Sequence, residues 1–291
     1  MSIGEARIHE RGYRTYDGER TGVLGAVRAL VVNSAQRALG LGRPVRHKVM
    51  PAAVMIMAYL PGAAFVGAAA LIPGELEDEF LPSYADYYGF ISAALFLFAA
   101  FVAPELLSTD RRTGMLGVYL ASPLDRRTYL LAKAIAVFGL LSIVTLGPPL
   151  LLLIALSLEG SGPDSWTEGL RLAVRIFASS MVMSAVFAAV SLAVSATTER
   201  QIAATATIIG LLVGTTALAS ILEEGADLPD SIRLISLIGV PVELNYRIHG
   251  ELGEWRVDEV PTWSLWLAVF VVVTGSTIWI WDRYRRLVVR R

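Results

Sequence analysis

Long apolar blocks separated by short charged stretches dominate the pattern of this chain. A helix needs about 20 mostly apolar residues to cross the hydrocarbon layer of a membrane. Six blocks are long enough, and they predict spans at residues 49–72, 87–103, 129–158, 172–196, 201–222 and 263–281. The pattern therefore predicts an all-α integral membrane protein with six transmembrane helices.

Two further segments are apolar on one side or too short to span. Residues 21–40 place their aliphatic side chains on one helical face and Arg28 and Arg37 away from it, which predicts an amphipathic helix on the inner leaflet with its basic groups among lipid phosphates. The alternative is an ordinary helix packed on a partner. Residues 232–248 begin with a short apolar run, which predicts a re-entrant or outer-leaflet segment.

Lysine and arginine are distributed unevenly between the connecting segments. Nineteen fall in segments that would share one side of the membrane, against three (Arg233, Arg247 and Arg256) on the other. Positive residues are retained in the cytoplasm, so both termini are expected there in a multi-pass protein of the plasma membrane. The chain then divides into a cytoplasmic segment 1–48, a six-span domain 49–281 and a basic tail 282–291.

Composition narrows the chemistry. The chain is 55% hydrophobic and 18% charged, with a net charge of −1, no cysteine and three histidines outside the predicted spans. These features argue against a metal site and against an intramembrane protease that uses histidine as its base. No nucleic-acid partner is expected. Neither lysine follows a glycine, so no phosphate-binding loop is expected. The nearly uncharged middles of the spans argue against an ion-coupled transporter, so any energy must come from another chain.

The connection between the second and third spans, residues 104–128, is the most informative stretch. Pro104 is expected to stop the second span and to start a new helix, with Glu105 and Asp110 near its N-terminus. Gly114 lets the backbone turn or a neighbour approach, and Pro123 ends the piece. The stretch predicts a short cytoplasmic helix that offers acidic, basic and apolar groups to a docking protein; its apolar face is Met115, Leu116, Tyr119 and Leu120.

This stretch resembles the ABC type-2 exporter permeases. That family shows a Glu/Asp-Arg-x-x-Gly-x-Leu run, then Leu-x-x-Pro-Leu-x-Arg, then a lysine about seven residues later. The matching residues here are Asp110, Arg111, Gly114, Leu116, Leu120, Pro123, Leu124, Arg126 and Lys133. Aspartate stands where glutamate is common, and Met115 where threonine is common. Residues 16–20 and 104–108 also resemble actinobacterial members.

The resemblance implies a coupling helix at about residues 105–121 that touches a nucleotide-binding subunit. ATP and Mg²⁺ would be bound by that partner, and this chain would carry no cofactor and no catalytic residue. A second permease, identical or related, and membrane lipids would complete the assembly. The residues implied in coupling are Glu105, Asp110, Arg111, Arg112, Gly114, Leu116, Pro123 and Arg126. An alternative stays open, because any membrane protein can carry acids at a helix start and positive charges on its cytoplasmic side without a docking role for these residues.

Small residues in the fifth span, Ala206, Gly210 and Gly214, form a pattern that lets two helix backbones meet closely in lipid. It fits either a subunit interface or packing within the chain. The candidate substrate path is aromatic and hydroxylated: Phe65, Phe96, Phe98, Thr205 and Thr215. Such a lining suits a lipophilic or amphipathic cargo.

The sequence thus favours the membrane-spanning permease subunit of an ATP-driven exporter of drugs, peptides or lipids. A glycolipid or polysaccharide exporter is the alternative within the same class. A non-transport membrane scaffold or an immunity protein is the alternative from a different class.

Overall fold

The computed structural model describes residues 22–71, 82–226, 229–255 and 257–286. Predictions for residues 1–21, including the resemblance at 16–20, and for the end of the basic tail lie outside these ranges. In the described residues, six helices are long and apolar enough to cross a membrane, and no strand is present. They are α2 (Arg46–Ala69), α4 (Tyr84–Arg112), α6 (Arg126–Glu159), α7 (Trp166–Ser195), α8 (Gln201–Ala226) and α10 (Thr262–Arg286). The predicted all-α membrane fold is confirmed.

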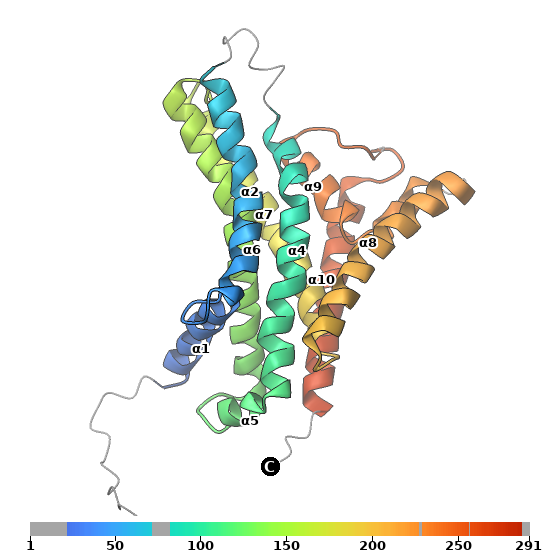
Figure 1. Ribbon diagram of the computed structural model, residues 1–291. Coiled ribbons are helices and arrows are strands. Elements are labelled where there is room, and N and C mark those ends of the chain that lie inside the picture. Colours follow the sequence, from blue (N-terminus) through green and yellow to red (C-terminus); the bar gives the residue numbers. More distant parts are fainter. Residues whose placement is uncertain (1–21, 72–81, 227–228, 256, 287–291) are drawn as a thin grey trace, which may run out of the picture.

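Among the described residues, four shorter elements lie at the two ends of this bundle (Figure 1). At the end where α4 and α10 finish are α1 (Gly22–Ala38) and α5 (Met115–Leu120). At the opposite end are η2 (Asp230–Ile235) and α9 (Gly239–His249), which occupy the segment predicted not to span. Neither η2 nor α9 is long enough to cross a membrane.

The centre of the bundle is formed by α4 and α7. Alanine and serine are frequent among the buried residues of both helices, for example Ala99 and Ala103 on α4 and Ser184 and Ser191 on α7. Small side chains let helix backbones approach closely where no water drives association. In contrast, α2, α8 and α10 keep much of their apolar surface exposed, which leaves it for lipid or for partners.

Side-chain caps set several helix ends that apolar run length alone does not locate. Asp125 accepts a hydrogen bond from the Thr128 backbone N–H (2.7 Å) while the Thr128 hydroxyl accepts one from the Asp125 N–H (2.9 Å), so α6 begins at Arg126. The backbone bond holds the pKa of the Asp125 carboxyl below its ordinary value. Ser165 caps α7 in a related way by accepting from the Glu168 N–H (3.3 Å).

The prediction that Pro104 ends the second span is wrong, because α4 continues through it to Arg112. A proline cannot donate to the carbonyl four residues earlier, here that of Ala100. The Thr205 hydroxyl on α8 donates to this carbonyl instead, at 2.9 Å. A neighbouring helix that satisfies the freed carbonyl makes proline tolerable inside a membrane helix.

A similar arrangement is found in α6, which is continuous through Pro148 and Pro149. Pro149 cannot serve the carbonyl of Thr145, and the Ser180 hydroxyl on α7 donates to that carbonyl at 3.0 Å. The Thr145 hydroxyl in turn pairs with Ser184 at 2.9 Å. The carbonyl that Pro149 frees in the middle of the span is therefore served by a serine of the neighbouring helix.

Candidate functional site

The connection between α4 and α6 is a tight elbow. Gly114 has a φ of 72°, a left-handed conformation that favours glycine, and it separates the end of α4 from the six-residue α5. No atom lies within 4 Å of a Cβ built at Gly114, so the glycine serves the turn rather than a close approach. The predicted single helix at 105–121 is wrong: its first half is the end of α4, and only Met115–Leu120 forms a separate helix.

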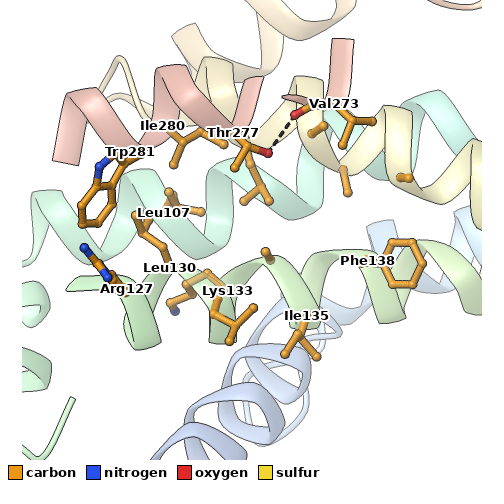
Figure 2. A pocket seen from close by; sticks show the side chains of 16 residues that line it. Leu107, Arg127, Leu130, Lys133, Ile135, Phe138, Val273, Thr277, Ile280 and Trp281 are labelled. Atoms are coloured by element: carbon orange, nitrogen blue, oxygen red, sulfur yellow. Dashed lines mark hydrogen bonds between the residues drawn. The ribbon is translucent and has the colours of Figure 1, made fainter. Parts of the chain in front are cut away.

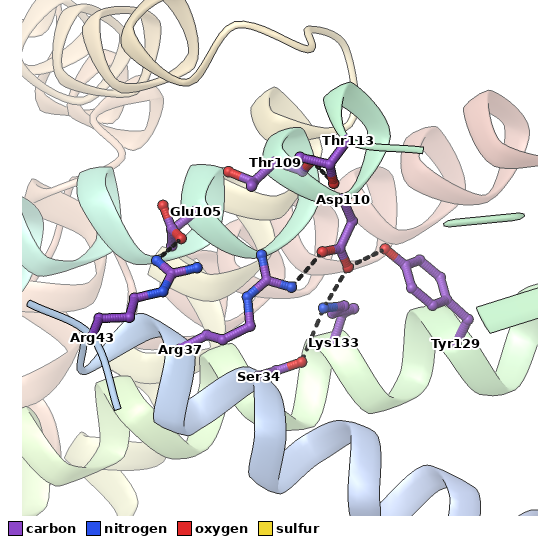
Figure 3. A network of polar contacts seen from close by, with 9 residues as sticks. All are labelled: Ser34, Arg37, Arg43, Glu105, Thr109, Asp110, Thr113, Tyr129 and Lys133. Atoms are coloured by element: carbon purple, nitrogen blue, oxygen red, sulfur yellow. Dashed lines mark hydrogen bonds and ion pairs between the residues drawn. The ribbon is translucent and has the colours of Figure 1, made fainter. Parts of the chain in front are cut away.

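Asp110 therefore lies near the C-terminus of a helix, where the helix dipole disfavours an acid. Other partners stabilise its carboxylate (Figure 3). Arg37 of α1 lies 2.7 Å from one oxygen, and Lys133 of α6 lies 2.7 Å from the other. The Tyr129 hydroxyl also donates to Asp110 at 3.2 Å, and the Lys133 ammonium donates to Ser34 of α1 at 2.9 Å. We call these five residues the Asp110 network.

The Asp110 network is buried. The side chains of Asp110 and Lys133 are 0% and 1% exposed, and the Lys133 ammonium also lies 5.5 Å and 5.6 Å from the ring centroids of Tyr119 and Tyr129. Removal of one member of such a pair leaves an uncompensated buried charge, at a cost of about 3–5 kcal/mol. Asp110 thus joins α1, α4 and α6, and it is not accessible to a docking protein as the sequence suggested.

The structure also changes the assignments of three neighbouring charges. Arg37 was expected among lipid phosphates but faces the bundle. Burial of its guanidinium lowers the pKa of Arg37, but the hydrogen bond to Asp110 and the attraction of that carboxylate and its neighbours together outweigh burial, so the pKa is raised. Glu105 accepts from Arg43 at 2.6 Å. Arg111 donates to the carbonyl of Ala196 at 2.6 Å, at the end of α7.

The outward side of the elbow is formed by a different set of residues. Val118 and Met115 of α5 are 63% and 36% exposed. Arg112 and Pro123 flank them and are exposed as well. We call Arg112, Met115, Val118 and Pro123 the elbow surface. Sequence reasoning missed Val118. The signal that could have found it is that the apolar residues of this six-residue helix lie on every side, which is more apolar surface than packing on one face requires.

Two residues predicted to act in coupling lie on the inner side of the elbow or beside it. Leu116 is half-buried and packs against the core of the bundle. Arg126, at the first position of α6, donates to the carbonyl of Arg285 at 2.8 Å. Both residues therefore fix α5 and α6 to the rest of the bundle.

A lateral groove of about 610 Å³ opens between α6 and α10 (Figure 2). At the α5 end of the bundle, the Arg127 guanidinium stands over the Trp281 ring, 5.2 Å from its centroid. The groove is mostly aliphatic and is lined by Leu107, Arg127, Leu130, Leu131, Lys133, Ala134, Ile135, Phe138, Ala185, Ala188, Ala189, Leu192, Val273, Thr277, Ile280 and Trp281. A second cavity, of about 160 Å³, lies where α1, α2 and α4 meet.

Comparison with protein families decides the broad class of the molecule. A family model described as ABC-2 family transporter protein matches residues 53–280, a range that includes the elbow and reaches into all six long helices. The chain belongs to the ABC-2 transporter family. No curated protein matches it.

As an ABC-2 family member, the chain is a multi-pass membrane protein and a permease subunit of an ABC transporter. The family is a transport component of the membrane rather than a catalytic enzyme, and membership implies an ATP-binding partner subunit. Within the described ranges, no three or more His, Cys, Asp or Glu side chains are grouped so that they could hold a metal ion.

The small-residue pattern of the ABC-2 permease lies on an exposed face of α8. Ala206, Gly210 and Gly214 are all exposed, and a Cβ built on either glycine meets no described atom within 4 Å. The alternative that these residues pack within the chain is therefore wrong. This face is available to lipid or to another subunit.

The structure does not bring the residues of the predicted substrate path together in one cavity. Phe98 lines the smaller cavity, and Phe96 packs against the core. Phe65 makes edge contacts with neighbouring aromatic rings, at centroid distances of 6.1 and 5.2 Å. Thr205 serves the carbonyl that Pro104 frees, and Thr215 accepts from the Leu237 N–H at 3.3 Å. The substrate path remains a prediction.

Proposed function

We propose that this permease exports a lipophilic or amphipathic substrate across the plasma membrane, driven by separate nucleotide-binding subunits that bind ATP and Mg²⁺. The observation that carries the proposal is the elbow surface. Val118 and Met115 place exposed apolar area at the end of the bundle, beyond the spans, where water would otherwise cover it. An apolar patch flanked by a cation, here Arg112, is typical of a protein–protein contact.

The Asp110 network supports a route from the elbow surface to the spans. Thr113 and Gly114 join α5 to α4, and a short connection joins α5 to α6. Asp110 and Lys133 fix the ends of these two long helices to each other, while Arg37 fixes α1 to α4 and Ser34 fixes α1 to α6. A partner that displaces α5 would therefore move the ends of α1, α4 and α6 as one unit.

The positive charges of the α5 end support a cytoplasmic location for the elbow. The chain contains no cysteine, so single cysteines report on topology without background. We expect Leu252→Cys, which replaces a 78% exposed residue at the opposite end, to react with a membrane-impermeant maleimide on intact cells. Val118→Cys should react only after permeabilisation. The reverse pattern would contradict the orientation.

The exposed face of α8 supports pairing with a second permease. Gly210→Leu should lower the dimer fraction of the purified complex, because bulk at this position separates two closely packed backbones. Gly275→Leu is the matched control, since Gly275 is exposed on α10 and a Cβ there also meets no atom within 4 Å. Equal dimer fractions in the two variants would refute this interface.

ATP hydrolysis by the assembled transporter tests the function itself. The tagged full-length chain should co-purify with a subunit that contains a phosphate-binding loop. Val118→Asp should reduce both its recovery and its substrate-stimulated ATPase activity several-fold, because a charge would have to be desolvated in the contact. Leu252→Asp, at the opposite end, should have no effect. Purification without any such ATPase would favour the scaffold alternative.

A further inference from the structure

The lateral groove lies away from the elbow surface and from the predicted substrate path. Its two walls are α6 and α10, and Leu107 of α4 lies between them (Figure 2). Residues of α7 complete the floor. Three alanines of α7, Ala185, Ala188 and Ala189, give the floor its depth because their side chains are short. None of Phe65, Phe96, Phe98, Thr205 and Thr215 lines it.

The length of the groove matches one leaflet of a membrane. Eleven positions along α6 separate Arg127 from Phe138, which is a rise of about 17 Å in an α-helix. Half of the hydrocarbon layer is about 15 Å thick. The groove therefore runs from the membrane interface at the α5 end to about the middle of the bilayer.

The mouth of the groove is positive and aromatic. Arg127 is exposed, contacts the Trp281 ring and forms no ion pair with a carboxylate among the described residues; the nearby Asp125 carboxylate caps α6 instead. Across the mouth, Asp282 is already paired with Arg285 and Arg286. Tryptophan is favoured at the level of lipid headgroups, and an exposed guanidinium there attracts phosphate.

We propose that the lateral groove is a binding site for one anionic phospholipid of the leaflet at the α5 end. Its acyl chain lies against the aliphatic lining between α6 and α10, and its phosphate lies at Arg127. The lipid fills a space that the chain itself leaves open between two spans. This binding needs neither the ATPase partner nor the transported substrate, so its failure would leave the proposed function untouched.

Native mass spectrometry of the purified full-length chain tests the proposal. The chain is delipidated in detergent and titrated with phosphatidylglycerol, or with phosphatidylcholine of the same acyl chains. We expect one phosphatidylglycerol to be retained preferentially. Arg127→Gln should weaken its retention by about fivefold, because one basic residue near the headgroups contributes a free energy of that order. Phosphatidylcholine, with no net charge, should change less.

Two controls make the result specific. Arg28→Gln removes the same charge from an exposed position of α1, so an equal loss there would overturn the assignment to the groove. Ala189→Phe fills the floor and should abolish retention of both lipids, whereas Gly275→Phe adds the same ring to an exposed position outside the groove and should not. Retention by Ala189→Phe that equals that of the unaltered chain would also refute the site. Only variants that elute as a single monodisperse species are compared.

Discussion

Replacement of Asp110 by asparagine perturbs the centre of the Asp110 network with almost no change in volume. The carboxylate accepts from three donors, on Arg37, Lys133 and Tyr129, and it is fully buried. Asparagine offers one oxygen and turns an N–H₂ group toward a cation, which leaves the Lys133 ammonium buried without a countercharge. The expected loss of folding free energy is about 3–5 kcal/mol.

Thermal unfolding of the purified full-length chain measures this loss. A loss of 1 kcal/mol lowers the midpoint of a domain of about 150–250 residues by about 2–4 °C, so Asp110→Asn should lower it by about 6 °C or more. Glu105→Gln is the matched control, because the Glu105 and Arg43 side chains are 18% and 30% exposed and such pairs contribute at most about 1 kcal/mol. If both variants shifted the midpoint equally, the network would not brace the elbow.

A double variant separates charge from packing. Lys133→Met combined with Asp110→Asn removes both buried charges, and an uncharged pair of similar volume is often as stable as the ion pair it replaces. The double variant should therefore recover most of the stability that Asp110→Asn loses. Additive losses from the two substitutions would refute a direct interaction between them.

Three further outcomes follow from particular residues. Thr205→Val should lower the thermal midpoint by an amount equivalent to about 1 kcal/mol, because the carbonyl freed by Pro104 loses its donor. Adding Pro104→Ala should remove this effect. Thr207→Val is the control and should not change the midpoint, because the Thr207 hydroxyl donates only within its own helix. Burial lowers the pKa of His249 below its ordinary 6.5, so the unfolded chain binds the proton more readily than the folded chain. The free energy of unfolding should therefore fall as the pH drops below about 6.5. His249→Gln should flatten this dependence of stability on pH between about pH 7 and 5. Gly114→Ala places a side chain at a φ of 72°, which adds strain of about 1–2 kcal/mol, and it should reduce substrate-stimulated ATPase activity of the complex.

Apolar run length was sufficient to predict the spans, because a membrane imposes the same minimum length on every crossing helix. Local rules failed where a distant residue decides the outcome. Pro104 was expected to end a helix, but Thr205, 105 positions away from Ala100, supplies the missing donor to the Ala100 carbonyl. No rule restricted to neighbouring residues contains that contact.

The candidate site divides in the same way. A turn at Gly114 was predictable from one residue, but the helix predicted at 105–121 divides at this glycine into the end of α4 and α5. The burial of Asp110 was not, because its partner Arg37 lies 73 positions away and the charge alone resembles a surface acid. The lateral groove likewise depends on how α6, α7 and α10 pack, which the order of their apolar residues does not encode.

Crosslinking from the elbow surface tests the central claim most directly. The cysteine-free chain allows a single Val118→Cys to carry a photoactivatable crosslinker in the assembled complex, with Leu252→Cys at the opposite end as the control. The account predicts an adduct between position 118 and a subunit that contains a phosphate-binding loop, and no such adduct from position 252. An ATPase adduct at position 252, or none at position 118 in a complex that hydrolyses ATP, would contradict it.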